Sequence, residues 1–217
     1  MANISENWFT GIIDLSHHQE QAIDWNALQE ASIIAVIHKA TEGRTFTDDR
    51  YHKRRQQAKD RGLLWGSYHF AGPADSDPVE QADHYLDFIG STDGEFICFD
   101  CEKHGSYDNM LSFARHVHSR LNRYPAIYGR RLLRELMHGK EGSEVTRGVL
   151  WYDEYPPDPH IQPRQQLPDG WEDWTLWQYS DGAHGPTPRS PQQVGGDRNA
   201  FKGTAEELRQ AWPFIRN

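Results

Sequence analysis

Short apolar runs that alternate with segments of helical periodicity constrain the fold of this chain more than any other feature. The runs have strand length and lie at residues Gly11–Leu15, Ile33–Ile37, Leu63–Phe70, Phe96–Phe99, Ala126–Tyr128, Val149–Tyr152 and Trp174–Tyr179. In Val79–Ile89 and Met110–Leu121 the apolar residues have the spacing of an amphipathic helix. Strands that alternate with helices predict a parallel sheet covered by helices.

The last third of the chain departs from this alternation. After a short predicted helix at Arg130–Met137, residues Val149–Gly196 are rich in Pro, Gly and aromatic residues and show no amphipathic helix. A polar, exposed helix is predicted at Asp49–Arg61, and a capping box at Thr204 opens the last helix. We therefore expect an α/β fold, an irregular (β/α) barrel with helices missing after the later strands. The barrel is expected to be a single domain over residues 1–217.

Composition excludes several classes of protein. Hydrophobic residues make up 36% and aromatic residues 12% of the 217 residues, which is typical of a folded chain. Lys and Arg number 23 against 32 Asp and Glu, a formal net charge of −9, so the basic surface of a nucleic-acid-binding protein is not expected. No apolar stretch approaches the roughly 20 residues of a membrane span. We expect neither nucleic acid nor a membrane span, and we favour a monomer.

Cys98 and Cys101 are the only cysteines. On an extended strand these two positions point to opposite faces, so we expect free thiols, which fit synthesis in a reducing compartment. Residues 1–7 lack the basic and apolar regions of a standard secretion signal. No signal peptide is therefore expected.

Two carboxylates, Asp100 and Glu102, follow the apolar run Phe96–Phe99. Strand alternation places both on one face, and barrel enzymes carry their chemistry at the C-terminal ends of strands. Two carboxyl groups this close oppose each other's ionisation, so one pKa is expected to rise while the other group stays charged. Such a pair supplies the acid and the anion that cleavage of a glycosidic bond requires. An isolated Asp-x-Glu also occurs on exposed turns.

Two further acids have a similar placement. Asp14 ends the first apolar run, and Asp197 precedes the last helix. Each alone is typical of a cap or a turn. Four acids from remote parts of the chain at expected strand ends favour one acidic site.

Aromatic residues gather near two late strands. Trp151, Tyr152 and Tyr155 surround one, and Trp177, Gln178 and Tyr179 end the other. Aromatic rings pack against sugar rings and amides bind hydroxyls, although part of this set is expected in the core.

A metal site is the rival interpretation. His17, His18, His38 and His69 also lie near strand ends and could join Asp14 or Asp100 around a metal ion. No His-x-His or His-x-x-x-His supplies two ligands from one element at a strand end. We therefore expect no metal and no other cofactor.

Seven motifs occur in the order found in one known family. They are Gly11–Gln19 followed by Ile23–Trp25, Ile37–Gly43, Gly66–Phe70, Phe99–Glu102, Leu150–Trp151 with Tyr155, Leu176–Tyr179 and Asp197–Phe201. From Gly11 to about Phe201 the sequence resembles the glycoside hydrolase family 25 lysozymes, the N-acetylmuramidases of bacteria, phages and fungi. Departures from the family pattern are His18, Asp153 and Cys101, and the first two touch the expected groove.

The resemblance implies a barrel of about eight strands. It also implies hydrolysis of the β-1,4 bond between N-acetylmuramic acid and N-acetylglucosamine, with glycan strands of peptidoglycan as the partner. It implies Glu102 as general acid, Asp100 as its charged neighbour at the substrate N-acetyl group, Asp14 and Asp197 as an acidic floor, and Tyr68 beside the intermediate. The other residues expected to contact substrate are His69, Tyr128, Trp151, Tyr152, Asp153, Trp177, Gln178 and Asn199.

Retention with participation of the N-acetyl group is favoured, because a pair on one short strand lies on one side of the bond. Two alternatives stay open: a glycan-binding barrel without turnover, and an endo-N-acetylglucosaminidase or chitinase-like enzyme. Action on the cell wall without a signal peptide predicts release through a holin or a dedicated export machine.

Overall fold

The computed structural model describes residues 8–20, 22–155, 166–182, 184–185 and 196–215. The strands in these residues are β1 (Phe9–Leu15), β2 (Ala35–Glu42), β3 (Phe46–Thr47), β4 (Leu64–Phe70), β5 (Phe96–Asp100), β6 (Ala126–Gly129), β7 (Leu150–Asp153), β8 (Leu176–Ser180) and β9 (Asp197–Phe201). The helices are α1 (Trp25–Glu30), α2 (Tyr51–Lys59), α3 (Pro78–Ile89), α4 (Tyr107–Leu121), α5 (Arg131–Met137), the 3₁₀ turn η1 (Glu144–Arg147) and α6 (Ala205–Ala211).

Eight of these strands close into a barrel. The order is β1-β9-β8-β7-β6-β5-β4-β2, and β1 also pairs with β2, while the short β3 adds a hairpin to β2. Strand β9 runs antiparallel to both β1 and β8, and the other neighbours in the barrel are parallel. The predicted barrel, irregular in its last third, is confirmed. Asp197 is the first residue of β9 and does not belong to a cap or a turn, which was the alternative for this acid taken alone.

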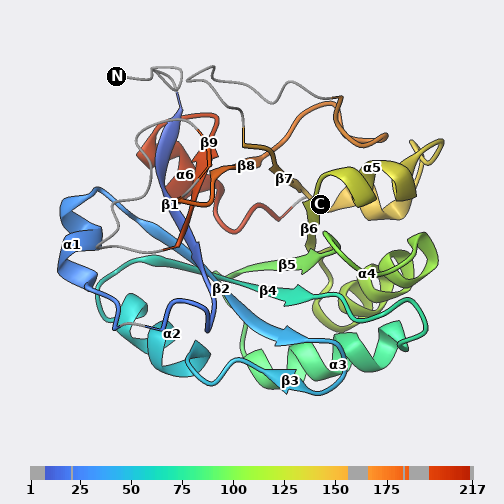
Figure 1. The fold of residues 1–217 in the computed structure, drawn as a ribbon, viewed down its shortest axis with the longest axis horizontal. Helices are drawn as coiled ribbons and strands as arrows, with labels where there is room; N and C mark the ends of the chain where they lie inside the picture. The colour runs from blue at the N-terminus through green and yellow to red at the C-terminus, as the bar shows by residue number, and fades with distance from the viewer. Residues whose placement is uncertain (1–7, 21, 156–165, 183, 186–195, 216–217) are drawn as a thin grey trace.

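Side chains from alternate strand positions form two cores, one inside the barrel and one between barrel and helices. Ile12, Ile37 and Phe96 belong to the inner core, whereas Ile13 and Val36 belong to the outer one. Strands buried on both faces explain the nearly continuous apolar runs of the sequence. In Figure 1, helices α2, α3 and α4 lie outside β2, β4 and β5.

Helix α6 belongs to the inner core. Its Leu208, together with Trp212 just after it, packs among residues that point into the barrel, and the Trp212 indole donates to the carbonyl of Trp65 at 3.2 Å. Trp65 lies near the N-terminal end of β4. The helix therefore closes the barrel at the end opposite the C-terminal ends of the parallel strands.

The helix boundaries follow local signals. Asp77 caps α3, with Pro78 in the first turn, and Thr204 with Glu207 forms the predicted capping box of α6. Helix α2 departs from prediction, because it buries Tyr51 and Arg54 rather than lying exposed along its length. Its buried face includes a guanidinium, which an apolar pattern cannot reveal.

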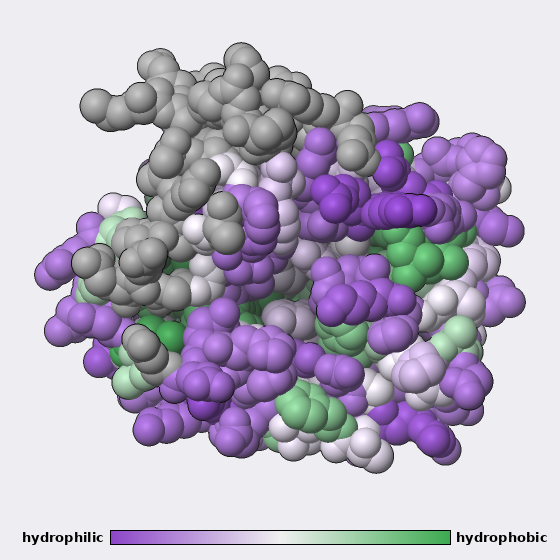
Figure 2. Space-filling view, in the orientation of Figure 1, coloured by the Kyte–Doolittle hydropathy of each residue, from purple (hydrophilic) through white to green (hydrophobic). Residues whose placement is uncertain are grey.

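The two cysteines are free and buried, with Cys98 in the inner core and Cys101 in the outer one. Their placement on opposite faces is as predicted. Most of the surface seen in Figure 2 is hydrophilic, and the large apolar side chains exposed among the described residues are Phe46, Val79 and Ile215. A helix long and apolar enough to cross a membrane does not occur in the described parts of the chain.

Candidate active site

A pocket of about 360 Å³ opens at the C-terminal ends of the parallel strands. Its lining comes from seven barrel strands or the residues just after them and from the start of β9. The lining residues are Asp14, Ser16, His18, Lys39, Glu42, Tyr68, Phe70, Asp100, Glu102, Lys103, His104, Tyr128, Trp151, Tyr155, Gln178 and Asp197. Because β9 is antiparallel, its first residue, Asp197, lies at the same end of the barrel as the last residues of the other strands.

All four carboxylates expected at the site line this one pocket. Asp14 and Asp100 are buried, Asp197 is half-buried and Glu102 is exposed. Asp14 is paired in register with Asp197 across β1 and β9. The backbone N–H of Glu102 donates to Oδ1 of Asp100 at 3.0 Å, so the bend after β5 fixes one carboxylate against the peptide of the other.

Burial changes the proton affinity of three of these acids. It raises the pKa of Asp100 well above its usual range, with the charge of Glu102 as the next cause. Burial also raises the pKa of Asp14 to about 6, opposed by hydrogen bonds from Gln178 and Asn199. The pKa of Asp197 rises to about 9, through burial and then the charge of Asp14. The expected rise in pKa therefore occurs at Asp100, the buried carboxyl at the end of β5.

Two amides hold the acidic floor, which consists of Asp14 and Asp197. Gln178 Nε2 donates to Asp14 at 2.9 Å and to Asp197 at 3.2 Å, and Asn199 Nδ2 donates to Asp14 at 2.8 Å. The indole of Trp151 donates to Asn199 Oδ1 at 2.7 Å. An indole N–H can only donate, so it fixes which end of the Asn199 amide faces Asp14.

Gln178 is oriented in the same way from its other side. Its Oε1 accepts from the hydroxyls of Tyr128, at 2.7 Å, and Tyr155. Both amides thus donate N–H groups to carboxylates, so the hydrogen bonds that hold the acidic floor come from protein side chains. Asn199, expected to contact substrate, is fully buried and lies beneath the acids as a positioning residue.

Three other residues expected to contact substrate lie outside the pocket. His69, Tyr152 and Trp177 are 0% exposed. Tyr152 and Trp177 belong to the core between barrel and helices, and His69 stacks on Phe113 of that core. The prediction is wrong for them because strand side chains alternate: Tyr68, Trp151 and Gln178 point inward, so the adjacent residues point outward.

Asp153 is also absent from the pocket lining. It is 8% exposed, and its Oδ2 lies 3.7 Å from Nε of Arg130. Burial raises its pKa to about 6, with Arg130 opposing the rise. Its expected contact with substrate is therefore not supported by its position.

The pocket also contains residues that were not predicted to line it, just after β1, on β2 and β4, and in the segment after β5: Ser16, Lys39, Glu42, Phe70, Lys103 and His104. These residues could have been predicted to line the pocket because they lie in or beside the family motifs. Lys39 and Glu42 belong to the second motif, and Lys103 directly follows Glu102.

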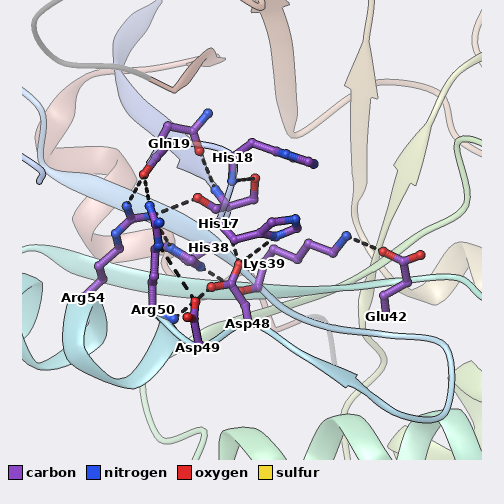
Figure 3. A network of polar contacts seen from close by, with 11 residues as sticks. His17, His18, Gln19, His38, Lys39, Glu42, Asp48, Asp49, Arg50 and Arg54 are labelled. Atoms are coloured by element: carbon purple, nitrogen blue, oxygen red, sulfur yellow. Dashed lines mark hydrogen bonds and ion pairs between the residues drawn. The ribbon is translucent and has the colours of Figure 1, made fainter. Parts of the chain in front are cut away.

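Polar contacts anchor the segment after β1 to α2 (Figure 3). Asp48 accepts from the backbone N–H of His17 at 2.7 Å, and Arg54 donates to the carbonyl of Ser16 at 2.9 Å. Arg54 also contacts Nε2 of His38 at 3.0 Å. These contacts therefore fix the segment after β1, which places His18 in the pocket lining.

The histidines of the rival metal interpretation do not converge. His38 and His69 are fully buried, His17 faces Asp48, and His18 lines the pocket. Among the described residues, no group of three or more His, Cys, Asp and Glu side chains is arranged to hold a metal ion.

Carboxylates at the C-terminal end of a barrel, beside aromatic rings and amides, define a barrel glycosidase. The sequence profile described as glycosyl hydrolases family 25 matches residues 13–186. The chain therefore belongs to glycosyl hydrolase family 25 and is a glycoside hydrolase.

Individual relatives agree with this assignment. The chain is 28% identical to Lysozyme M1 of Streptomyces globisporus, over 90% of this chain and 69% of that protein. It is 24% identical to the N,O-diacetylmuramidase of Chalaropsis sp., over 91% of this chain and 96% of the relative. The crystal structure of a bacterial lysozyme from Streptomyces coelicolor superposes with a TM-score of 0.75 at 26% identity, covering 95% of this chain and 97% of the other.

Proposed function

We propose that this glycoside hydrolase is a muramidase that cleaves the β-1,4 bond between N-acetylmuramic acid and N-acetylglucosamine in peptidoglycan. The observation that carries the proposal is the pair Asp100 and Glu102, which line one pocket together with Asp14 and Asp197. The names of two relatives, a lysozyme and an N,O-diacetylmuramidase, support the same substrate. The site of action is then the cell wall, and the export route remains a prediction.

Glu102 is the general acid of the proposed reaction. Its side chain is exposed at the pocket, where a glycosidic oxygen can reach it, and it has room to move with the bond that breaks. As the bond from C1 to the leaving oxygen breaks, the proton of Glu102 passes to that oxygen and leaves a free 4-hydroxyl.

The substrate acetamido group is the proposed nucleophile. Its carbonyl oxygen forms a bond to C1 from the face opposite the leaving group, which gives a cyclic oxazolinium. Water, deprotonated by the carboxylate of Glu102, then attacks C1 and reopens the ring. Two inversions give net retention, and every proton removed in one step is returned in the other.

Asp100 assists this step as an acceptor for the acetamido N–H. Burial and the neighbouring Glu102 give its carboxyl a raised pKa, so its ionised form binds a proton strongly. The positive charge that develops on the oxazolinium favours that ionised form. Tyr68 also lies in the pocket, and burial raises its pKa well above the usual range, so its hydroxyl remains a donor beside the intermediate.

Product analysis tests the proposal. Purified peptidoglycan is digested with the protein, and the new reducing ends are reduced with borohydride and identified by mass. We expect muramitol derivatives. Glucosaminitol at the new ends would instead indicate an endo-N-acetylglucosaminidase, and an absence of new reducing ends with retained binding would indicate a glycan-binding barrel without turnover.

A further inference from the structure

The two sides of the pocket differ in charge. The side formed by β6, β7 and β8 presents neutral groups, namely Tyr128, Trp151, Tyr155 and Gln178. The side formed by β2, β4 and the segment after β5 presents two ammonium groups, Lys39 and Lys103, together with Phe70, Glu42, His104 and the proposed general acid Glu102. We call this second side the lysine wall. A glycan lying between the two sides therefore meets cations on only one of them.

Both ammonium groups of the lysine wall lie near one aromatic ring. Nζ of Lys39 is 4.7 Å and Nζ of Lys103 is 5.9 Å from the centre of the Phe70 ring. Lys39 also lies 5.2 Å from the ring of Phe46. The two positive charges of this side therefore lie beside the same ring, where they can attract an anionic group of the substrate.

The charge of the lysine wall is only partly balanced. Lys39 contacts Oε2 of Glu42 at 2.5 Å, and Figure 3 shows the two side chains reaching toward each other. Within the described parts of the chain, Lys103 is paired with no carboxylate. The Glu42 side chain is 43% exposed, and the charge of Lys39 also opposes the rise in the pKa of Asp100.

Lys39 is held in place more firmly than a surface lysine. Its side chain is 7% exposed, and strand β2 presents it between the two phenyl rings. Its entropy cost on binding an anion is therefore small compared with that of a free lysine. Of the carboxyls deeper in the pocket, Asp197 does not strongly oppose an anion, because burial favours its protonated form.

We propose that Lys39 and Lys103 bind a carboxylate on the muramic acid side of the substrate, which orients the glycan in the pocket and favours muramic acid over glucosamine as the sugar at this side. The inference rests on the proposed function. In peptidoglycan such a carboxylate comes from one of two sources, the lactyl group of a muramic acid without peptide or the stem peptide attached to it. Glucosamine carries neither.

Four substrates test the proposal. They are intact peptidoglycan, glycan strands from which an amidase has removed the stem peptides, and each of these after its carboxyl groups have been converted to methylamides. The kcat/KM for release of reducing ends is measured on each. We expect the wild type to prefer at least one carboxylate substrate over its own methylamide about tenfold, the value of a well-formed charge-assisted hydrogen bond.

Substitutions then connect the preference to the lysine wall. Lys103→Gln and Lys39→Met should reduce the ratio of carboxylate to methylamide activity toward one. Glu42→Gln removes the competing carboxylate and should raise that ratio, so the proposal predicts effects of opposite sign from neighbouring residues. Lys53→Gln, on the exposed face of α2, is the matched control and should leave the ratio unchanged.

The possible outcomes distinguish the source of the carboxylate, and they distinguish failure of this inference from failure of the proposed function. Preference on intact peptidoglycan alone identifies the stem peptide, preference on stripped strands alone identifies the lactyl group, and preference on both means that both are bound. Equal activity on every carboxylate and its methylamide overturns the inference while the proposed function stands. A ratio unchanged in all three wall variants overturns it as well. Absence of hydrolysis on all four substrates contradicts the proposed function itself.

Discussion

The acidic floor and the bend after β5 are built in opposite ways. At the floor, Asp14 accepts from two amides whose own orientations are fixed by an indole and two phenols. At the bend, Glu102 is exposed, and the contact that connects it to the site is its backbone N–H to Asp100. The acidic floor is therefore rigid, whereas Glu102, the proposed proton donor, can move with the substrate.

The acidic floor and the bend after β5 therefore have different roles in the proposed reaction. Groups that stabilise developing charge act best when their dipoles are already oriented before the reaction. A general acid must instead come within hydrogen-bond reach of an oxygen that moves as its bond breaks. Substitution at the bend should therefore affect turnover and leave the fold intact, whereas substitution at the floor should affect both.

The largest effect is expected at the bend. Glu102→Gln keeps the size of the side chain but cannot supply the proton, so kcat should fall by about 10²- to 10⁴-fold. Because the side chain is exposed, the midpoint of thermal unfolding should stay close to that of the wild type. Release of reducing ends from purified peptidoglycan, with circular dichroism as the folding control, measures both. Turnover close to that of the wild type would refute the assignment.

A smaller effect on turnover, joined to a loss of stability, is expected at the floor. Asn199→Ala removes an acceptor from the Trp151 indole and a donor from Asp14. Leaving these buried groups unpaired should cost about 1–3 kcal/mol in the free energy of unfolding. We expect kcat to fall about tenfold as well, since the orientation of Asp14 is lost. Asn26→Ala, on the exposed surface of α1, is the control, and equal behaviour of the two variants would mean that the floor is not preorganised.

The smallest effect concerns the dependence of stability on pH. In the fold the pKa of Asp197 is raised from 3.8 to about 9. The native state therefore retains a proton that the unfolded chain has lost, so this contribution is complete below about pH 4 and is lost as the pH rises toward 9. Asp197→Asn cannot ionise and should lose less stability between pH 5 and pH 6 than the wild type, by about 1 kcal/mol.

Urea unfolding at the two pH values measures this difference, with the exposed Asp108 changed to Asn as the control. Relative to the wild type, Asp197→Asn should be more stable at pH 6 than at pH 5. Parallel losses in wild type and variant would show that Asp197 ionises in the fold as it does in the unfolded chain.

The barrel could be predicted because most of its strands are buried on both faces. Runs such as Phe96–Phe99 and Val149–Tyr152 carry that burial in their composition, and they lie within one residue of β5 and β7. Strand β9 could not be found in this way. Its residues Asp197 and Asn199 point toward the pocket and its floor, so a strand that builds the site has the composition of a loop.

The pocket lining includes some of the residues predicted at the site and excludes residues adjacent to them in the strands. Asp100 and Gln178 were placed at the pocket correctly, while His69, Tyr152 and Trp177 were placed there wrongly. Period-two alternation contains this distinction, since each of the three adjoins a residue that points inward. Arg54 is different in kind: the sequence does not reveal that a guanidinium is buried in order to hold the segment after β1.

The central claim is that acid and anion act from one side of the bond, with the substrate acetamido group attacking from the other. The anomeric configuration of the first product tests this claim most directly. Proton NMR in the first minutes of digestion of a soluble glycan, before mutarotation, should show the β-anomer at the new reducing end. An α-anomer would require water to attack in a single inversion and would contradict the account.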